Sequence, residues 1–288
     1  MNCNLKKKLI LGTANFGMPY GTRSKTGAIH INAIEKILNL MAENNLFRID
    51  TAQAYGNAES VLGDIGMKDF KVFTKITIKK GENISDKVEA SLGNLKLSAL
   101  EGVLIHNAEF INEDDLQESI EKLEALKKEG TINKIGISIY NPTILTKLPS
   151  GLTIDICQAP VNIINRKFLE NSCIQSLNSI SAELHARSVF LQGALLMEKK
   201  EFLDYFSGKF LMIFEEYDYF IKNMNVTRLD YCLGWALEQS SVAKIPIGVD
   251  SVEQLSTILK ITEYPLSQGN FLYSGKDNIQ SFADPRSW

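Results

Sequence analysis

The chain has 288 residues, and its 31 basic and 34 acidic side chains give a formal net charge of −3. This balance argues against a nucleic-acid-binding protein, which carries a basic surface to neutralise phosphates. With 44% hydrophobic and 23% charged residues, the composition is that of an ordinary soluble globular protein.

The cysteines and the N-terminal segment both favour a cytoplasmic protein. The four cysteines are Cys3, Cys157, Cys173 and Cys232. They form no CxxC pair, and the three histidines lie far from one another, so we expect reduced thiols and no metal site. The basic start is followed by an apolar stretch that stops at Gly12, which is too short for a signal peptide. No stretch approaches the ~20 apolar residues of a membrane helix.

Short apolar runs alternate with segments of helical periodicity along the chain. Eight runs read as strands, and most lack the alternating polar residues of a half-exposed strand, as expected for strands buried on both faces. In chain order they are Leu9–Ala14, Phe47–Ala52, Lys71–Ile76, Gly102–His106, Lys134–Ile139, Ile156–Val161, Ser188–Leu191 and Lys244–Val249.

Helices are predicted between these strands from apolar residues spaced three and four apart. They are Asn32–Asn45, Ile84–Leu97, Asp114–Glu129, a helix near Phe202–Asn223, a helix near Thr227–Gln239, and Ser251–Ile261. Gly130 is expected to end the third of these helices, and Ser251 to cap the start of the last.

Repeated strand–helix alternation predicts an α/β protein, either a doubly wound open sheet or a closed (β/α)8 TIM barrel. The count of eight strands, the chain length and the absence of a GxGxxG motif after the first strand favour the barrel. No linker or shift in composition marks a second domain, so residues 1–288 are predicted to form a single barrel domain.

Polar residues at the ends of three successive strands indicate where the chemistry lies, because barrel active sites form at the carboxyl ends of the strands. Asp50 ends the second strand, Tyr55 follows in its loop, Lys75 lies near the end of the third strand, and His106 ends the fourth. Each residue alone could be structural, as a self-satisfied Asp–Lys pair or a hydrogen-bonded core histidine. Four such groups at one mouth favour a catalytic interpretation.

These four groups suit the reduction of a carbonyl, in which a group must protonate the alkoxide that forms. A phenol is a weak acid, with an unperturbed pKa of ~10. A lysine ammonium ~4 Å away contributes ~4 kcal/mol at an effective dielectric constant of ~20, before desolvation is subtracted. We therefore predict Tyr55 as the acid, Lys75 as the group that lowers its pKa, Asp50 as the residue that orients Lys75, and His106 as a donor to the substrate oxygen.

Several segments resemble the landmarks of the aldo-keto reductases. They are Leu11–Gly17, Asp50-Thr51-Ala52-Gln53-Ala54-Tyr55-Gly56, Thr74-Lys75, His106-Asn107, Lys134–Ser138, Gln158–Asn162, Gln192-Gly193 and Gly248–Leu255. The resemblance spans nearly the whole chain in the expected order. It implies a barrel that binds a nicotinamide cofactor without a Rossmann motif and transfers hydride directly to an aldehyde or ketone without a metal.

The same resemblance implies the residues that bind the cofactor. Those near the nicotinamide and its ribose are Gly12, Thr13, Asp50, Ser138 and Gln158. Those toward the pyrophosphate are Ser188, Gln192 and Gly193, and those around the adenosine are Gly248, Asp250, Ser251 and Gln254.

The chain departs from the pattern of the family at several of these positions. Ile139 replaces an Asn that contacts the carboxamide, and Arg187 aligns where many members stack an aromatic ring on the nicotinamide. Gly248 and Gln254 replace the Lys and Arg that commonly bind the 2′-phosphate, and Asp250 disfavours a phosphate there. The family implies NADPH, with NADH as the alternative.

The substrate is predicted to be a small carbonyl compound, with a keto-sugar as the specific hypothesis. The opening segment, residues 185–196 and the closing Asp284–Trp288 resemble reductases associated with bacterial surface-polysaccharide genes. Aromatic residues on the expected substrate loops also suit a hydroxylated substrate: Tyr20, Phe110, Tyr140 and Trp288. Two alternatives remain open, a Schiff-base aldolase that uses Lys75 and a catalytically weak nicotinamide-binding barrel that acts as a sensor or scaffold.

Overall fold

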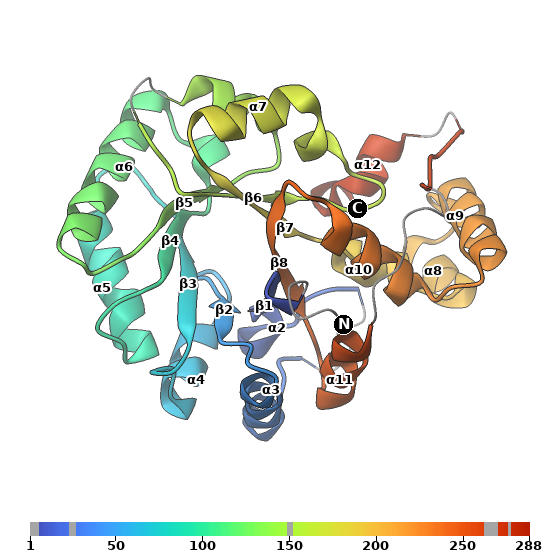
Figure 1. The fold of residues 1–288 in the computed structure, drawn as a ribbon, viewed down its shortest axis with the longest axis horizontal. Coiled ribbons are helices and arrows are strands. Elements are labelled where there is room, and N and C mark those ends of the chain that lie inside the picture. Colours follow the sequence, from blue (N-terminus) through green and yellow to red (C-terminus); the bar gives the residue numbers. More distant parts are fainter. Residues whose placement is uncertain (1–5, 23–26, 149–151, 262–269, 276–277) are drawn as a thin grey trace.

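Eight parallel strands close into a barrel in the order of the sequence, from β1 to β8 and back to β1 (Figure 1). The computed structural model describes residues 6–22, 27–148, 152–261, 270–275 and 278–288. The strands are β1 (Leu9–Gly12), β2 (Arg48–Asp50), β3 (Lys71–Ile76), β4 (Gly102–Ile105), β5 (Ile135–Ser138), β6 (Ile156–Pro160), β7 (Glu183–Arg187) and β8 (Val242–Gly248). The predicted (β/α)8 barrel is confirmed.

Helices alternate with the strands and lie outside them (Figure 1). Among the described residues they are α2 (Ala14–Gly17), α3 (Ile31–Glu43), α4 (Ala58–Ile65), α5 (Ile84–Leu95), α6 (Glu113–Lys128), α7 (Asn171–Ser179), α8 (Lys199–Phe206), α9 (Leu211–Met224), α10 (Arg228–Glu238), α11 (Val252–Lys260) and α12 (Ile279–Ala283). The predicted caps are confirmed, because Ser251 accepts a hydrogen bond from the Gln254 backbone N–H at the start of α11 and Gly130 follows the last turn of α6 with φ of 81°.

The seventh strand was predicted at the wrong residues. It runs over Glu183–Arg187, whereas the predicted segment Ser188–Leu191 is the loop that follows it. The strand escaped prediction because polar His185 and Arg187 interrupt its apolar pattern. Ser188, with φ of 60°, leaves the extended conformation and ends the strand.

The long helix predicted near Phe202–Asn223 is two helices, α8 and α9. The break lies at Ser207 and Gly208, whose φ values of 50° and 83° are left-handed and incompatible with a continuing right-handed helix. The apolar periodicity continues across this turn because both helices bury one face. The periodicity alone therefore concealed the break.

The hydrophobic core has two parts, one inside the barrel and one between the strands and the helices. A small cluster of four side chains fills the barrel interior: Ile10, Phe73, Leu104 and Ile156. Side chains two residues apart on a strand point to the same face. Lys75, His106 and Gln158 follow members of this cluster by two residues, so they form the next layer toward the carboxyl ends of the strands.

Two further observations concern the membrane and the metal predictions. Within the described part of the chain, no helix combines the length and apolar character needed to cross a bilayer. Across the same residues, no cluster of three or more His, Cys, Asp or Glu side chains could hold a metal ion. Cys157, Cys173 and Cys232 are buried and free, and Cys3 lies outside the described residues.

Candidate active site

A buried network joins the carboxylate of β2 to the lysine of β3 and the glutamine of β6. The Lys75 Nζ lies 2.6 Å from Asp50 Oδ2 and donates to the Thr51 carbonyl at 2.9 Å. The Gln158 Nε2 donates to the other carboxylate oxygen of Asp50 at 2.7 Å. Lys75 is 0% exposed and Asp50 is 4% exposed, so both charges are removed from water and depend on each other.

The charge state of Lys75 follows from two opposing effects. Burial lowers the pKa of the Lys75 amine, but the nearby Asp50 carboxylate and Tyr55 hydroxyl raise it, and the net shift is upward. Lys75 therefore remains an ammonium at neutral pH. A Schiff base requires a neutral amine, so this environment disfavours the aldolase alternative.

Tyr55 presents its hydroxyl to the same ammonium. The Lys75 Nζ lies 3.3 Å from Tyr55 Oη and 4.9 Å from the centroid of the Tyr55 ring. The loop that carries Tyr55 is held by two glycines. A Cβ on Gly17 would lie 1.9 Å from the Tyr55 carbonyl oxygen, and a Cβ on Gly56, whose φ is 60°, would lie 2.2 Å from the Gly17 carbonyl oxygen. No larger side chain fits at either glycine without displacing the tyrosine loop.

His106 faces Tyr55 edge-on, with their ring centroids 6.1 Å apart and an interplanar angle of 87°. Burial, together with the positive charges of Lys75 and Arg187, lowers the pKa of His106 to about 4. The imidazole is therefore neutral at physiological pH. A neutral imidazole carries one N–H donor that can hold a substrate oxygen.

A cavity of about 700 Å³ lies at the carboxyl ends of the strands. Of the four predicted catalytic residues, Asp50 and Tyr55 line it, whereas Lys75 and His106 do not belong to the lining. Eleven predicted catalytic or cofactor residues line the cavity: Gly12, Thr13, Asp50, Tyr55, Gln158, Ser188, Gln192, Gly193, Gly248, Asp250 and Gln254. Two predicted cofactor residues do not belong to the lining. Ser251 instead caps α11, and Ser138 is buried beside Gln158 in the β5–β6 register.

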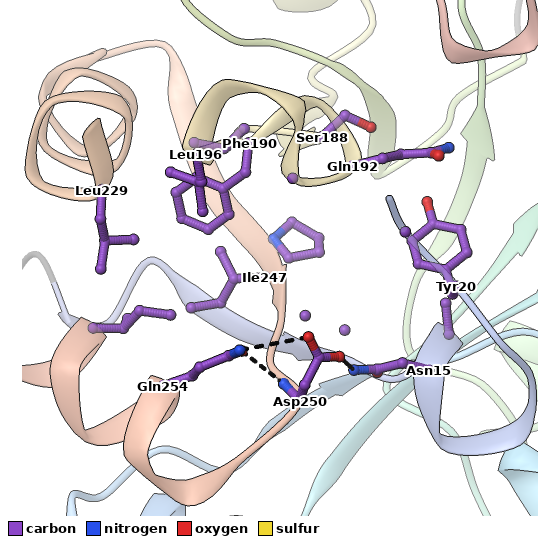
Figure 2. A pocket seen from close by; sticks show the side chains of 18 of the residues that line it. Asn15, Tyr20, Ser188, Phe190, Gln192, Leu196, Leu229, Ile247, Asp250 and Gln254 are labelled. Atoms are coloured by element: carbon purple, nitrogen blue, oxygen red, sulfur yellow. Dashed lines mark hydrogen bonds between the residues drawn. The ribbon is translucent and has the colours of Figure 1, made fainter. Parts of the chain in front are cut away.

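Apolar and polar side chains both line the cavity (Figure 2). Figure 2 shows Phe190, Leu196 and Leu229 on one side. Opposite them, Asp250 accepts a hydrogen bond from the Asn15 amide at 2.8 Å, and its backbone N–H donates to the Gln254 side chain at 2.8 Å. Such a lining suits a ligand with flat apolar rings and polar edges.

The lining also fits the carboxamide of a nicotinamide ring. The Gln158 Oε1 is buried and has no hydrogen-bond partner among the described residues, although its amide nitrogen is engaged by Asp50. A buried carbonyl oxygen without a donor costs free energy, and the N–H groups of a carboxamide would satisfy it. Asn15 also lines the cavity, and its Oδ1 is likewise buried without a hydrogen-bond partner among the described residues.

The loop after β7 bends into the cavity through left-handed residues. Ser188, Gln192 and Gly193 have φ values of 60°, 54° and 97°. A Cβ on Gly193 would lie 3.0 Å from the Thr22 hydroxyl oxygen, and Thr22 donates from both its backbone N–H and its hydroxyl to the Gln192 carbonyl at 2.9 Å. The loop after β1 and the loop after β7 are thus joined beside the cavity.

The four aromatic residues expected on the substrate loops have different surroundings. The Tyr140 ring lies against Arg187, whose Cζ is 4.0 Å from the ring centroid. Tyr20 lines the cavity, whereas Phe110 is 76% exposed. Trp288 packs against Phe206 of α8, with ring centroids 5.0 Å apart, so it contributes to helix packing and not to the lining. Residues 23–26, shortly after Tyr20 in the chain, lie outside the part that the structure describes.

Some lining residues carried no sequence signal. Glu198, Arg228 and Leu229 come from α10 and from the segment before α8. No motif marks these residues, because they reach the cavity only through the packing of helices that follow β7. Asn15 lies within the predicted motif Leu11–Gly17, and its amide pairing with Asp250 could not be inferred from spacing.

The protein is a closed parallel barrel with a Tyr–Lys–Asp–His cluster beside a cavity that suits a nicotinamide. This combination is that of a TIM-barrel oxidoreductase. The Aldo/keto reductase family profile matches residues 8–273. The chain therefore belongs to the aldo/keto reductase family and is an NAD(P)H-dependent enzyme that reduces carbonyl groups of small molecules.

Relatives and solved structures agree with this assignment. The chain is 24% identical over 273 residues to the D-arabinose 1-dehydrogenase of Saccharomyces cerevisiae, covering 85% of this chain and 80% of that protein. It is 26% identical over 252 residues to the oxidoreductase YqkF of Bacillus subtilis, covering 78% and 80%. Its fold matches the aldo-keto reductase AKR11C1 of Bacillus halodurans with a TM-score of 0.69 at 19% identity, covering 96% and 92%.

Proposed function

We propose that the enzyme reduces its carbonyl substrate with Tyr55 as the proton donor. The observation that carries this proposal is the 3.3 Å contact between Tyr55 Oη and the buried Lys75 Nζ at the edge of the cavity. A bound dihydronicotinamide supplies the hydride. As negative charge develops on the substrate oxygen, the Tyr55 hydroxyl gives its proton to that oxygen, and the adjacent ammonium stabilises the phenolate that remains.

Asp50 and His106 support this proton transfer in different ways. Asp50 holds the ammonium in place through the 2.6 Å contact with Lys75 Nζ. His106, neutral because burial lowers its pKa to about 4, donates an N–H to the substrate oxygen and aligns it with Tyr55. Because the neutral imidazole of His106 has no extra proton to give to the substrate oxygen, the phenol of Tyr55 takes the role of the acid.

The cofactor is proposed to lie along the cavity, with its nicotinamide at Tyr55 and its adenosine toward α11. Gln158 would hold the carboxamide, and Asp250 and Gln254 would surround the adenosine ribose. The family implies NADPH as the reductant. The carboxylates of Asp250 and Glu253 in the lining lower the preference for NADPH over NADH, because a 2′-phosphate would meet negative charge.

We further propose a hydroxylated substrate of the sugar class, such as a keto-sugar. The polar side chains of Tyr20 and Arg187, which line the cavity together with Tyr55, suit hydroxyl groups. The yeast relative is named for a sugar, D-arabinose. The resemblance to reductases of surface-polysaccharide genes points in the same direction.

Replacing the two cavity phenols separately tests the role of Tyr55. The Tyr55→Phe variant is expected to lower kcat by about 10²–10⁴-fold while NADPH still binds with its wild-type Kd, measured by cofactor fluorescence. Tyr20→Phe is the matched control, because Tyr20 lines the same cavity, whereas the Lys75 ammonium donates to Asp50, Thr51 and Tyr55. A Tyr55→Phe enzyme as active as Tyr20→Phe would exclude Tyr55 as the acid.

A further inference from the structure

Arg187 is a cation at the reaction end of the cavity with no assigned partner. It is the last residue of β7, and it lines the cavity together with Asp50 and Tyr55. His185, two residues earlier, packs on Phe73 inside the barrel with ring centroids 5.7 Å apart. Because side chains two residues apart share a face, Arg187 belongs to the polar layer above the apolar cluster of the barrel interior.

The guanidinium is held in a fixed orientation by its neighbours. Its Cζ lies 4.0 Å from the centroid of the Tyr140 ring, and its Nη2 donates to the Ile139 carbonyl at 3.3 Å. Arg286 stacks on the same ring, with its Cζ 3.6 Å from the centroid. Tyr140 therefore lies between two guanidinium groups.

The two arginines differ in what neutralises them. Arg286 forms an ion pair with Asp284, with its Nη2 2.6 Å from Oδ2, and lies 3.4 Å from Glu109 Oε2. Arg187 has no carboxylate within ion-pair distance among the described residues. Its main-chain and ring contacts leave most of its five N–H donors free to face the cavity.

Among the described residues, the acidic groups near Arg187 are engaged elsewhere, and Asp284, whose pKa the charge of Arg187 helps to lower, is paired with Arg286. The carboxylate of Asp50 is already engaged by Lys75 and by the Gln158 amide. His106 is neutral, and Tyr20 stays protonated because burial raises its pKa to about 12. Among the described residues that line the reaction end of the cavity, Arg187 therefore supplies a cation without an ion pair, on a planar fork that is oriented before any ligand arrives.

We propose that Arg187 binds a carboxylate of the carbonyl substrate, so that the enzyme selects keto acids, aldehyde acids or sugar acids. A guanidinium matches a carboxylate through two parallel N–H···O bonds, and such charge-assisted bonds are the strongest of their kind. The reacting carbonyl must lie at Tyr55 and the cation lines the same end of the cavity, so both groups can belong to one small molecule. This inference rests on the proposed function and narrows its substrate class.

Matched pairs of substrates test the proposal. Each pair has one acid and one neutral analogue of similar size: 4-carboxybenzaldehyde with 4-carbamoylbenzaldehyde, and D-glucuronate with D-glucose. The wild-type enzyme is expected to have a kcat/KM for the acid at least about tenfold higher than for the neutral partner. Arg187→Met is expected to lower kcat/KM for the acids by about 10–100-fold more than for their neutral partners, mainly through KM.

Two further variants keep the result interpretable. Arg187→Lys keeps the charge without the fork and is expected to recover part of the preference for acids. Arg286→Met removes the paired guanidinium on the other side of Tyr140 and is expected to preserve the acid-to-neutral ratio. The proposal is overturned if Arg187→Met lowers activity equally for acids and neutral partners, or if it weakens NADPH binding by the same factor.

Direct binding separates this inference from the proposed function. The product analogues 4-(hydroxymethyl)benzoate and 4-(hydroxymethyl)benzamide are titrated into each variant by calorimetry. If the benzoate binds wild type more tightly than the benzamide does, and Arg187→Met loses this difference, the carboxylate site is supported. This holds even if the enzyme reduces none of the four carbonyl substrates, because that result would contradict only the proposed substrate chemistry. Equal binding of the two analogues to wild type would overturn the role of Arg187.

Discussion

The two ends of the cavity differ in their charge. At the reaction end, the buried pair of Asp50 and Lys75 is neutral as a unit, and Arg187 adds a positive charge. At the end formed by α11, the lining carries the carboxylates of Asp250 and Glu253.

The arginine of the α11 end does not change this contrast. Arg228 lines that part of the cavity, but it is paired with Asp218 and lies 3.2 Å from Glu198 Oε1. The charge of Arg228 is therefore neutralised by carboxylates of the protein, whereas the charge of Arg187 is available to a ligand. Of the two arginines in the described lining, Arg187 is therefore the one that the protein leaves available to a ligand.

The largest effect is expected from breaking the ion pair at the reaction end. Lys75→Met leaves the Asp50 carboxylate buried without its cation and should lower the free energy of unfolding by about 3–5 kcal/mol. Urea denaturation measures this change. Lys96→Met is the matched control, because the Lys96–Asp64 pair is 62% exposed on both sides and is expected to contribute less than about 1 kcal/mol.

The double variant Asp50→Asn with Lys75→Met removes both charges and is expected to recover part of the lost stability. If the double variant is no more stable than Lys75→Met alone, the interpretation of this end as a mutually dependent charge pair is wrong.

An intermediate effect is expected from acid. Burial lowers the pKa of His106 to about 4 and also lowers that of His185, so the unfolded chain binds more protons than the native state between about pH 4 and 6.5. Stability from these histidines is complete above pH 6.5 and is lost as the pH falls. His106 should contribute about 1–2 kcal/mol of destabilisation between pH 7 and pH 5, and the contribution of His185 has the same sign.

Urea unfolding of wild type and His106→Gln at the two pH values measures this contribution. The variant is expected to lose less stability on acidification than wild type. An identical loss in both proteins would show that His106 is not buried in its neutral form.

The smallest effect is expected at the α11 end. Asp250→Asn keeps the shape of the side chain and removes a negative charge that a 2′-phosphate would face. NADPH should bind about threefold to tenfold more tightly, while the Kd for NADH, which lacks that phosphate, stays unchanged. Fluorescence titration with each cofactor measures both constants. Equal changes for the two cofactors would place the 2′-phosphate away from Asp250.

The sequence was sufficient to predict the barrel and to identify four polar residues that the fold brings together at its mouth. Eight β-rich runs at barrel-like spacing identified the architecture, and one wrong strand did not alter the count. Asp50, Tyr55, Lys75 and His106 could be found because each lies at or just after a strand end, where the fold must bring polar groups together. Had β7 been predicted at the correct residues, the same reasoning would have identified Arg187, because it ends that strand.

The sequence alone determines which residues share a face of a strand, because side chains alternate between the two faces with a period of two residues. Which charges stay unpaired depends instead on contacts between segments far apart in the sequence. Glu109 and Asp284 neutralise Arg286, while Arg187 on the other side of Tyr140 has no such partner among the described residues. Only the folded arrangement separates these two arginines, since desolvation and ion pairing act through space and not along the chain.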